Sequence, residues 1–126
     1  MAEAENTQTV GRVFKALIEK DLDLFHEQFH EDSVIEFPQS GERIVGGVNR
    51  RAVYSSFPGR PTLRRVRALG NLVVAEVSVD YGDATDWRAV FIYELRGGKI
   101  SQATAYWTQP FPAAASRAPW VEPMEG

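Results

Sequence analysis

Residues 72–100, LVVAEVSVDYGDATDWRAVFIYELRGGKI, carry the strongest structural signal in this chain. Apolar and polar residues alternate through Leu72–Tyr81 and again through Asp86–Arg96, which is the period of strands that bury one face. Gly97-Gly98 then indicates a tight hairpin into Ile100–Gln109. We therefore expect consecutive antiparallel strands here. The residues expected on the inner face of the first two are Val73, Ala75, Val77, Val79, Tyr81, Trp87, Ala89, Phe91, Tyr93 and Leu95.

The residues before this region predict helices and two further strands. Apolar residues recur at helical spacing over Thr9–Lys20, and Asp21 is a typical N-cap for a second, shorter helix. A third helix is expected after Gly46-Gly47, ending near Phe57–Gly59. Strands are expected at Ser33–Phe37 and Thr62–Leu69. This order predicts an α+β fold, a cone-shaped, curved antiparallel sheet packed on three N-terminal helices, with a cavity at its open end.

Length and composition indicate one domain over residues 1–126, with an extended Pro/Ala-rich tail over 110–126. The chain has no cysteine, which excludes disulfides and a thiol nucleophile. No apolar run approaches the roughly 20 residues that span a bilayer, and the acidic first residues do not resemble a secretory signal. These two observations lead us to expect a cytoplasmic location. Because the net charge is −3, we expect neither nucleic acid nor a membrane as partner.

Several short segments, in this order and spacing, carry a resemblance to a known superfamily. They are Phe14–Leu17, Asp21–Asp23, Glu31–Pro38, Gly46–Asn49, Gly97–Ile100 and Tyr106-Trp107. With them the chain resembles the nuclear transport factor 2 superfamily, and within it the SnoaL-like and ketosteroid-isomerase-like proteins. The resemblance implies the cone-shaped fold, a pocket and a homodimer formed through the sheet, but no particular reaction. The tail, with Pro110–Pro112 and Arg117–Glu122, is similar to that of one SnoaL-like branch.

The resemblance also indicates where catalytic groups of the ketosteroid isomerases would fall. The general base of those isomerases corresponds here to Phe37. Their oxyanion-binding tyrosine corresponds to Val13, and their protonated aspartate to Phe91. Apolar side chains cannot transfer a proton or bind an oxyanion, so the isomerase mechanism is not expected. The SnoaL-type cyclases also place an acid–base aspartate near Phe91, so their mechanism is not expected either. The epoxide hydrolases of this fold use an Asp-Arg-Asp relay, and Asp86, Arg88 and Glu94 supply similar residues on the face expected to point outward.

An apolar, aromatic-lined pocket for a small hydrophobic molecule is therefore the predicted functional site. The expected lining is Val13, Phe14, Leu17, Phe37, Tyr54, Trp87, Phe91, Tyr93 and Trp107. The catalytic candidates are Tyr54, Asp86 and Tyr106, and the sequence leaves open whether Tyr106 or Trp107 faces inward. Two alternatives remain: a non-catalytic binding or dimeric interaction module, and an isomerase, cyclase or epoxide-hydrolase-type enzyme that uses Tyr and Asp/Glu residues.

Three other features contain residue types that occur in binding sites. His26 and His30 have the four-residue spacing of a two-histidine metal site, but Phe25 and Phe29 occupy the apolar stripe, so we expect solvated histidines and no metal. The basic segment Arg60–Arg67 fits the outer face of a strand, with its arginines paired to acids such as Glu76. The glycine pairs lack the context of a phosphate loop, so no cofactor is expected.

Overall fold

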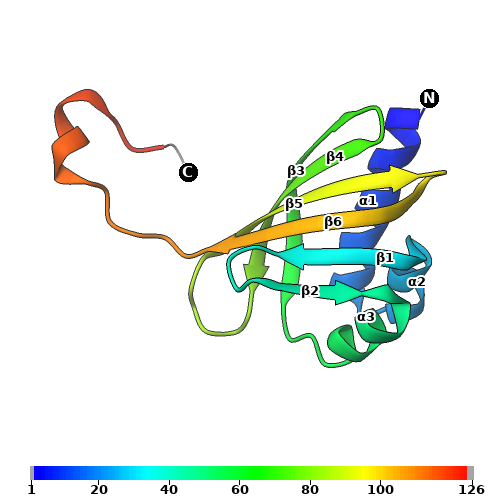
Figure 1. Cartoon of the computed structure of the whole chain (residues 1–126). Coiled ribbons are helices and arrows are strands. Elements are labelled where there is room, and N and C mark those ends of the chain that lie inside the picture. Colours follow the sequence, from blue (N-terminus) through cyan, green and yellow to red (C-terminus); the bar gives the residue numbers. More distant parts are fainter. Residues whose placement is uncertain (1, 125–126) are drawn as a thin grey trace.

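The computed structural model describes residues 2–124 and contains a six-stranded sheet, three α-helices and one short 3-10 helix (Figure 1). The sheet has the strand order β2-β1-β6-β5-β4-β3, in the numbering given next. The elements are α1 (Ala2–Glu19), α2 (Leu22–Glu27), β1 (Phe29–Phe37), β2 (Glu42–Val45), α3 (Gly46–Tyr54), β3 (Arg60–Leu69), β4 (Leu72–Asp80), β5 (Trp87–Arg96), β6 (Lys99–Thr108) and the 3-10 helix η1 (Ala115–Trp120).

The predicted antiparallel strands β3 to β6 are confirmed. Gly97 and Gly98 close the β5–β6 hairpin with φ values of 60° and 81°, the left-handed conformation that a type I′ turn requires at both positions. The expected inner face is buried, with Val73 and Ala75 fully inaccessible and Val79 only 5% exposed. The alternating pattern therefore placed these side chains on the correct face.

The sheet is mixed rather than wholly antiparallel, because β1 pairs with β6 in parallel. In this pairing Ile35 lies opposite Ala103. Because the two strands come from distant parts of the chain, no hairpin signal in the sequence indicates that they are parallel. The short edge strand β2, which pairs antiparallel with β1, was also not predicted. The α+β class and the curved sheet are confirmed.

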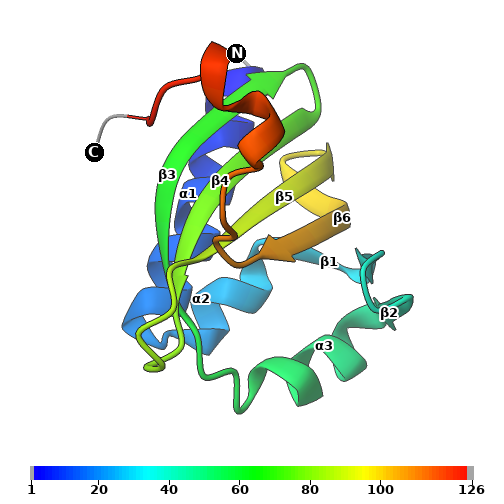
Figure 2. The same ribbon diagram turned by 90° about the vertical axis from the view of Figure 1, so that its left-hand side faces the viewer.

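Register shifts between strands account for the curvature of the sheet. The sequence predicted the curvature but did not reveal these shifts. They lie in β1 between Phe29 and Val34, in β3 between Leu63 and Arg65, and at Glu94/Leu95 opposite the start of β6. A bulge bends its strand and increases the local twist. The sheet consequently curves around α1, which packs on β3 and β4, while α3 covers β1 and β2 (Figure 2).

Helix α1 begins at Ala2, seven residues before the predicted start at Thr9. Polar side chains make the contacts there: the Asn6 amide donates to the Gly70 carbonyl at 3.0 Å and to Asn71 Oδ1 at 3.2 Å. The Thr9 hydroxyl donates to the Gly98 carbonyl at 2.9 Å. These bonds join α1 to two hairpin turns, and because they are polar the apolar period did not show them.

Both shorter helices were predicted, but their ends differ from the prediction. Asp21 caps α2 as predicted, since its carboxylate accepts from the Leu24 amide at 3.1 Å. The helix then stops at Glu27 and β1 starts at Phe29, four residues before the expected Ser33. Helix α3 ends at Tyr54, before the Phe57–Gly59 segment.

The tail after β6 extends away from the sheet and carries η1 (Figure 1). Phe111 and Trp120 are 77% and 81% exposed. Across residues 2–124, no helix combines the length and the apolar character needed to cross a membrane.

Candidate functional site

The inward-facing aromatic residues form a continuous cluster on the concave side of the sheet. Phe37 at the end of β1 contacts Trp107 of β6, with ring centroids 5.1 Å apart, and Trp107 contacts Phe91 at 6.1 Å. Phe91 stacks on Tyr93 at 5.8 Å and meets the edge of Phe14 at 5.3 Å. Five predicted lining residues are thus connected through a chain of ring contacts.

A second run of rings continues the cluster towards α3. Tyr54 contacts Phe57 at 5.3 Å, Phe57 contacts Tyr81 at 6.2 Å, and Tyr81 contacts Trp87 at 5.8 Å. Leu17 and Tyr54 line a cavity of about 190 Å³, together with Lys20, Leu22, Ser55 and Phe57. Tyr54 therefore connects this cavity to the aromatic cluster.

The outer members of this cluster are only partly buried although they face inward. We call them the aromatic rim, and they are Phe37, Phe57, Tyr81, Trp87, Phe91 and Trp107. Tyr54 and Tyr93, by contrast, are 8% and 2% exposed. The rim is thus the accessible edge of the core, at the end of the sheet where β1 and β6 finish.

The polar groups inside the cluster are tyrosine hydroxyls that stay protonated. Burial raises the pKa of Tyr54 and that of Tyr93 above the usual value of tyrosine. Burial also raises the pKa of Tyr81, against which the hydrogen bond from the Trp107 side chain acts. Neutral hydroxyls can donate hydrogen bonds to a carbonyl or ether oxygen, but they are poor sources of a proton.

The acids nearest to the cluster lie outside it. Asp80 accepts from the Gly82 amide at 2.7 Å, and Asp86 forms an ion pair with Arg88 at 2.9 Å. Glu36 lies on the strand face opposite to Ile35 and Phe37. The hydrogen bond from Arg88 lowers the pKa of Asp86 and keeps it ionised.

Asp83 is the carboxylate that touches the aromatic rim, and sequence reasoning did not single it out. Its Oδ2 accepts a hydrogen bond from the Trp87 indole at 3.0 Å. This bond, with one from the Thr85 amide, lowers the Asp83 pKa. A loop acid four residues before a tryptophan gives no recognisable motif, so no sequence signal marked it. The exposed Asp83 carboxylate fixes the orientation of Trp87.

The three catalytic candidates are not brought together. Tyr54 lies inside the core, Asp86 is exposed beside Arg88, and Tyr106 is 42% exposed on the outer face, opposite Val90. Trp107 rather than Tyr106 faces inward. The three positions that correspond to isomerase catalytic groups are apolar: Val13 is buried, and Phe37 and Phe91 belong to the aromatic rim.

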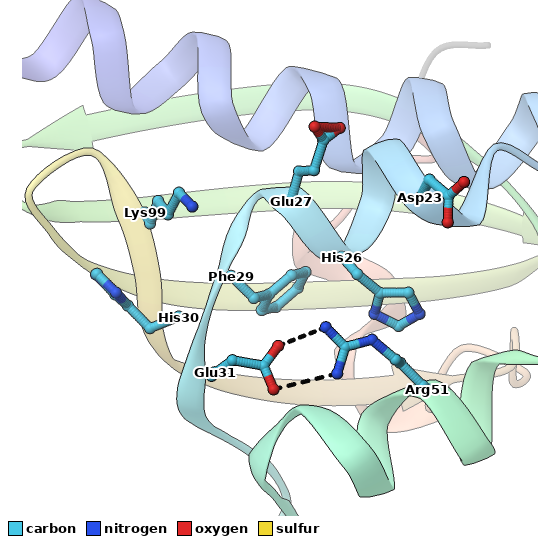
Figure 3. A pocket seen from close by; sticks show the side chains of 8 residues that line it. All are labelled: Asp23, His26, Glu27, Phe29, His30, Glu31, Arg51 and Lys99. Carbon is cyan, nitrogen blue, oxygen red and sulfur yellow. Dashed lines mark hydrogen bonds and ion pairs between the residues drawn. The ribbon is translucent and has the colours of Figure 1, made fainter.

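A separate, polar hollow of about 560 Å³ lies between α2, β1 and α3 (Figure 3). The Glu31–Arg51 ion pair crosses it, and His26 lies beside Arg51 in this view. The remaining lining residues are Asp23, Glu27, Phe29, His30 and Lys99. The two histidines do not converge, because His26 Nδ1 accepts from Arg50 at 3.0 Å while His30 Nε2 is 2.6 Å from the Arg96 carbonyl.

Arg50 is a buried arginine behind this hollow, with 1% of its surface exposed. Its Nη1 donates to Ser33 Oγ at 2.7 Å and to the His30 carbonyl at 3.3 Å, and its guanidinium stacks 4.6 Å from the centre of the Phe29 ring. Its Nη2 has no partner. Among residues 2–124, no three His, Cys, Asp or Glu side chains are grouped closely enough to hold a metal ion.

The basic segment on β3 lies on the outer face of the sheet. Arg65 forms a two-bond ion pair with Glu76, with one contact at 2.9 Å, and Arg64 donates to Ser78 Oγ at 2.7 Å. The pairing of Arg65 with Glu76 agrees with the prediction that these arginines neutralise neighbouring acids.

Comparisons with known proteins agree on the architecture. Residues 10–103 match the model of a family described as a SnoaL-like domain. An NTF-2 like protein of unknown function from Burkholderia xenovorans LB400 is 33% identical, the alignment covers 99% of each chain, and the TM-score is 0.89. A comparison with curated proteins found no match.

Two more distant structures show the same fold. A protein from Kribbella flavida DSM 17836, provisionally named a ketosteroid isomerase, is 23% identical over 100% of this chain and 94% of its own, with a TM-score of 0.91. An LEH-like epoxide hydrolase from M. tuberculosis is 20% identical over 86% of both chains, with a TM-score of 0.74. At these identities the likeness concerns the fold alone.

Proposed function

The chain belongs to the SnoaL-like domain family, and from this premise we propose that it binds a small hydrophobic molecule at the aromatic rim. The ligand has an apolar body and one oxygen that accepts a hydrogen bond from a buried tyrosine hydroxyl. Binding, rather than proton transfer, is the proposed role.

The observation that carries this proposal is the absence of an inward-facing carboxylate between residues 2 and 124 at a site rich in partly buried rings. Glu36, Asp80 and Asp86 all lie on the outer side or in the adjoining loop. The tyrosine hydroxyls are neutral because burial raises their pKa values. Asp83, which contacts the rim, is exposed and already accepts from the Trp87 indole, so it supplies no charge inside the cluster. A charged ligand would therefore lose its hydration there without a buried counter-ion, whereas a neutral apolar molecule would gain from the burial of its surface.

The test measures the binding of Nile red, a neutral apolar dye with a carbonyl oxygen. We expect a blue-shifted, saturable emission that Trp107→Ala weakens about tenfold or more, because loss of a buried aromatic costs roughly 2 kcal/mol or more at a binding hot spot. Tyr106→Ala, one residue away on the outer face, is the matched control and leaves the affinity unchanged. Equal effects of the two variants, or no saturable binding, would overturn the proposal.

The role of the hydroxyls is tested separately with Tyr93→Phe. The substitution keeps the ring that stacks on Phe91 and removes only the donor, so affinity for the carbonyl-bearing dye falls while affinity for a pure hydrocarbon such as pyrene is retained. An equal loss for both probes would show that the hydroxyl acts through the packing of the cluster and not through a bond to the ligand, and no loss for either probe would show that the ring alone contributes. Either result would overturn the proposed hydrogen bond.

We further propose that two copies associate through the outer face of the sheet. Val74 lies opposite Ile92, and Val90 opposite Tyr106. These partly buried and exposed apolar side chains of β4, β5 and β6 form one patch. The Arg65–Glu76 and Asp86–Arg88 ion pairs flank it. An apolar centre with a charged rim suits a self-complementary interface.

Sedimentation velocity tests this association. We expect a dimer for the unaltered chain and a monomer for Ile92→Glu, since a charge placed in the patch would be buried without a partner. Val48→Glu, at a 79% exposed position on α3, is the control that leaves the dimer intact. A monomeric unaltered chain would contradict the proposal.

A further inference from the structure

The segment that follows β6 has unusually exposed apolar side chains. Phe111 and Trp120 are 77% and 81% exposed, and Val121 and Met124 are 53% and 95% exposed. The segment leaves the end of β6 and runs clear of the three helices (Figure 1). A short segment with this many exposed large apolar groups is typical of an interaction surface.

The segment also has a defined backbone. Residues 115–120 form η1, and the Arg117 amide donates to the Ala114 carbonyl at 3.1 Å. Prolines at positions 110, 112, 119 and 123 restrict the chain further. Because restricted residues lose less entropy when they are ordered, such a segment can dock at low cost.

The tail is matched in other structures. The alignments with the Burkholderia and Kribbella structures span 99% and 100% of this chain, so they include the tail, whereas the more distant epoxide hydrolase aligns with 86%. A tail that is matched in separate structures and whose large apolar side chains are exposed on its own domain favours a contact with another molecule.

We infer that residues 109–124 form an arm that packs on the outer sheet face of a second copy, with Trp120 as its anchor; this inference rests on the proposed dimer. The arm starts at Gln109, three residues after Tyr106 of the outer patch, so it continues directly from the proposed interface. Trp120 lies twelve residues beyond Thr108. The stretch to Ala114 can extend over about 20 Å and η1 adds about 10 Å, so the indole can reach about 30 Å, enough to cross a neighbouring sheet.

The outer face offers a seat for the indole. A cavity of about 200 Å³ opens there between β3, β4 and β5, and it is lined by Arg64, Glu76, Val77, Arg88, Ala89 and Val90. Val90, which is 36% exposed, provides apolar contact on this face, and a guanidinium from Arg64 or Arg88 can stack on an indole ring. By symmetry each copy offers this cavity to the arm of the other.

The first test compares dimer dissociation by sedimentation velocity for four proteins: the unaltered chain, a chain ending at Gln109, Trp120→Ala, and Val48→Ala. The arm predicts that truncation and Trp120→Ala each raise the dimer Kd about tenfold or more, while Val48→Ala, an equally exposed apolar position on α3, has no effect. An unaltered Kd in both tail variants overturns the arm and leaves the dimer standing. A monomeric unaltered chain overturns both.

A second test locates the arm without relying on stability. The photoreactive residue p-benzoylphenylalanine replaces Trp120, and equal amounts of ¹⁵N-labelled and unlabelled chains are mixed before irradiation. We expect crosslinked peptides that pair a labelled tail with unlabelled residues of β3–β5. Crosslinks confined to a single chain, or to α1–α3 of the second copy, would overturn the inference.

Discussion

Arg50 Nε donates a hydrogen bond to Nδ1 of His26 across 3.0 Å, so the position of the buried guanidinium depends on an unprotonated imidazole. Burial, and then the charge of Arg50, lower the His26 pKa from 6.5 to about 4. Protonation of Nδ1 would both break this bond and place two cations side by side. The pair is therefore a pH-sensitive contact between α2 and α3.

Stability should fall as the pH is lowered from about 6.5 to about 4. In this window the unfolded chain carries a proton on His26 that the folded chain does not, so acid favours unfolding. Each pKa unit corresponds to about 1.4 kcal/mol, and partial solvent screening reduces the total to about 1–2 kcal/mol. Urea unfolding at several pH values measures this slope.

His26→Asn should flatten the slope, because asparagine offers an acceptor that does not titrate. Ser33→Ala is the control: it removes another partner of Arg50 but keeps the titrating imidazole, so it lowers stability without changing the slope. Carboxylates whose pKa values are lowered, such as Asp83 and Asp86, also lose stabilising interactions as the pH approaches 4. A slope between about pH 6.5 and 5 that is unchanged in His26→Asn would therefore contradict the assignment.

The buried Arg50 charge has no carboxylate within hydrogen-bonding distance in the described chain. Arg50→Met retains the packing on Phe29 and removes a charge that is costly to bury, so we expect a loss of no more than about 1 kcal/mol. Arg50→Ala also leaves a cavity and should cost about 3 kcal/mol. If chemical denaturation finds equal losses, the hydrogen bonds of the guanidinium determine the stability instead.

The amide of Asn6 joins the first turns of α1 to the β3–β4 turn through two hydrogen bonds. Asn6→Ala should therefore lower the free energy of unfolding by about 1–3 kcal/mol, since it removes both hydrogen bonds of a buried side chain. Thermal unfolding is the measurement, and Gln8→Ala, an exposed position on the same helix, is the control. Equal melting temperatures for the two variants would show that this end of α1 is dispensable.

Gly59 lies where no side chain fits without moving the aromatic rim. A Cβ atom there would be 2.6 Å from the Phe57 ring and 3.0 Å from that of Tyr81. Gly59→Ala should displace these rings and weaken Nile red binding several-fold. Gly11→Ala, with no atom within 4 Å of the added Cβ, is the matched control. Equal affinities of the two variants for Nile red would contradict the prediction.

The sequence pattern predicted most of the fold because alternation and capping are local signals. It could not decide between Tyr106 and Trp107 because the register shifts after Ile100, where Leu95 pairs with Ile100 but Glu94 with Gln102. The extra residue, Ser101, moves Ala103, Ala105 and Trp107 to the inner face. Simple alternation from Ile100 would have placed Tyr106 inside.

The candidate site was predictable in its apolar part and not in its polar part. Phe91 and Tyr93 follow from the strand period, whereas the Asp83–Trp87 bond depends on a loop conformation. Arg50 was not predicted as a buried residue, because its position among helical polar residues looks like any exposed arginine. Only the approach of α2 and β1 encloses it.

The parallel pairing of β1 with β6 affects the order in which the chain can fold. Ile35 must find Ala103, so during synthesis the first two helices and the β1–β2 hairpin emerge long before the strand that completes their sheet. Strand β1 then exposes one unpaired edge until Lys99–Thr108 has left the ribosome. Pairings between such distant segments slow folding, and an exposed edge can recruit other nascent chains. We expect the yield of soluble protein to depend on how quickly translation passes from β5 to the end of β6.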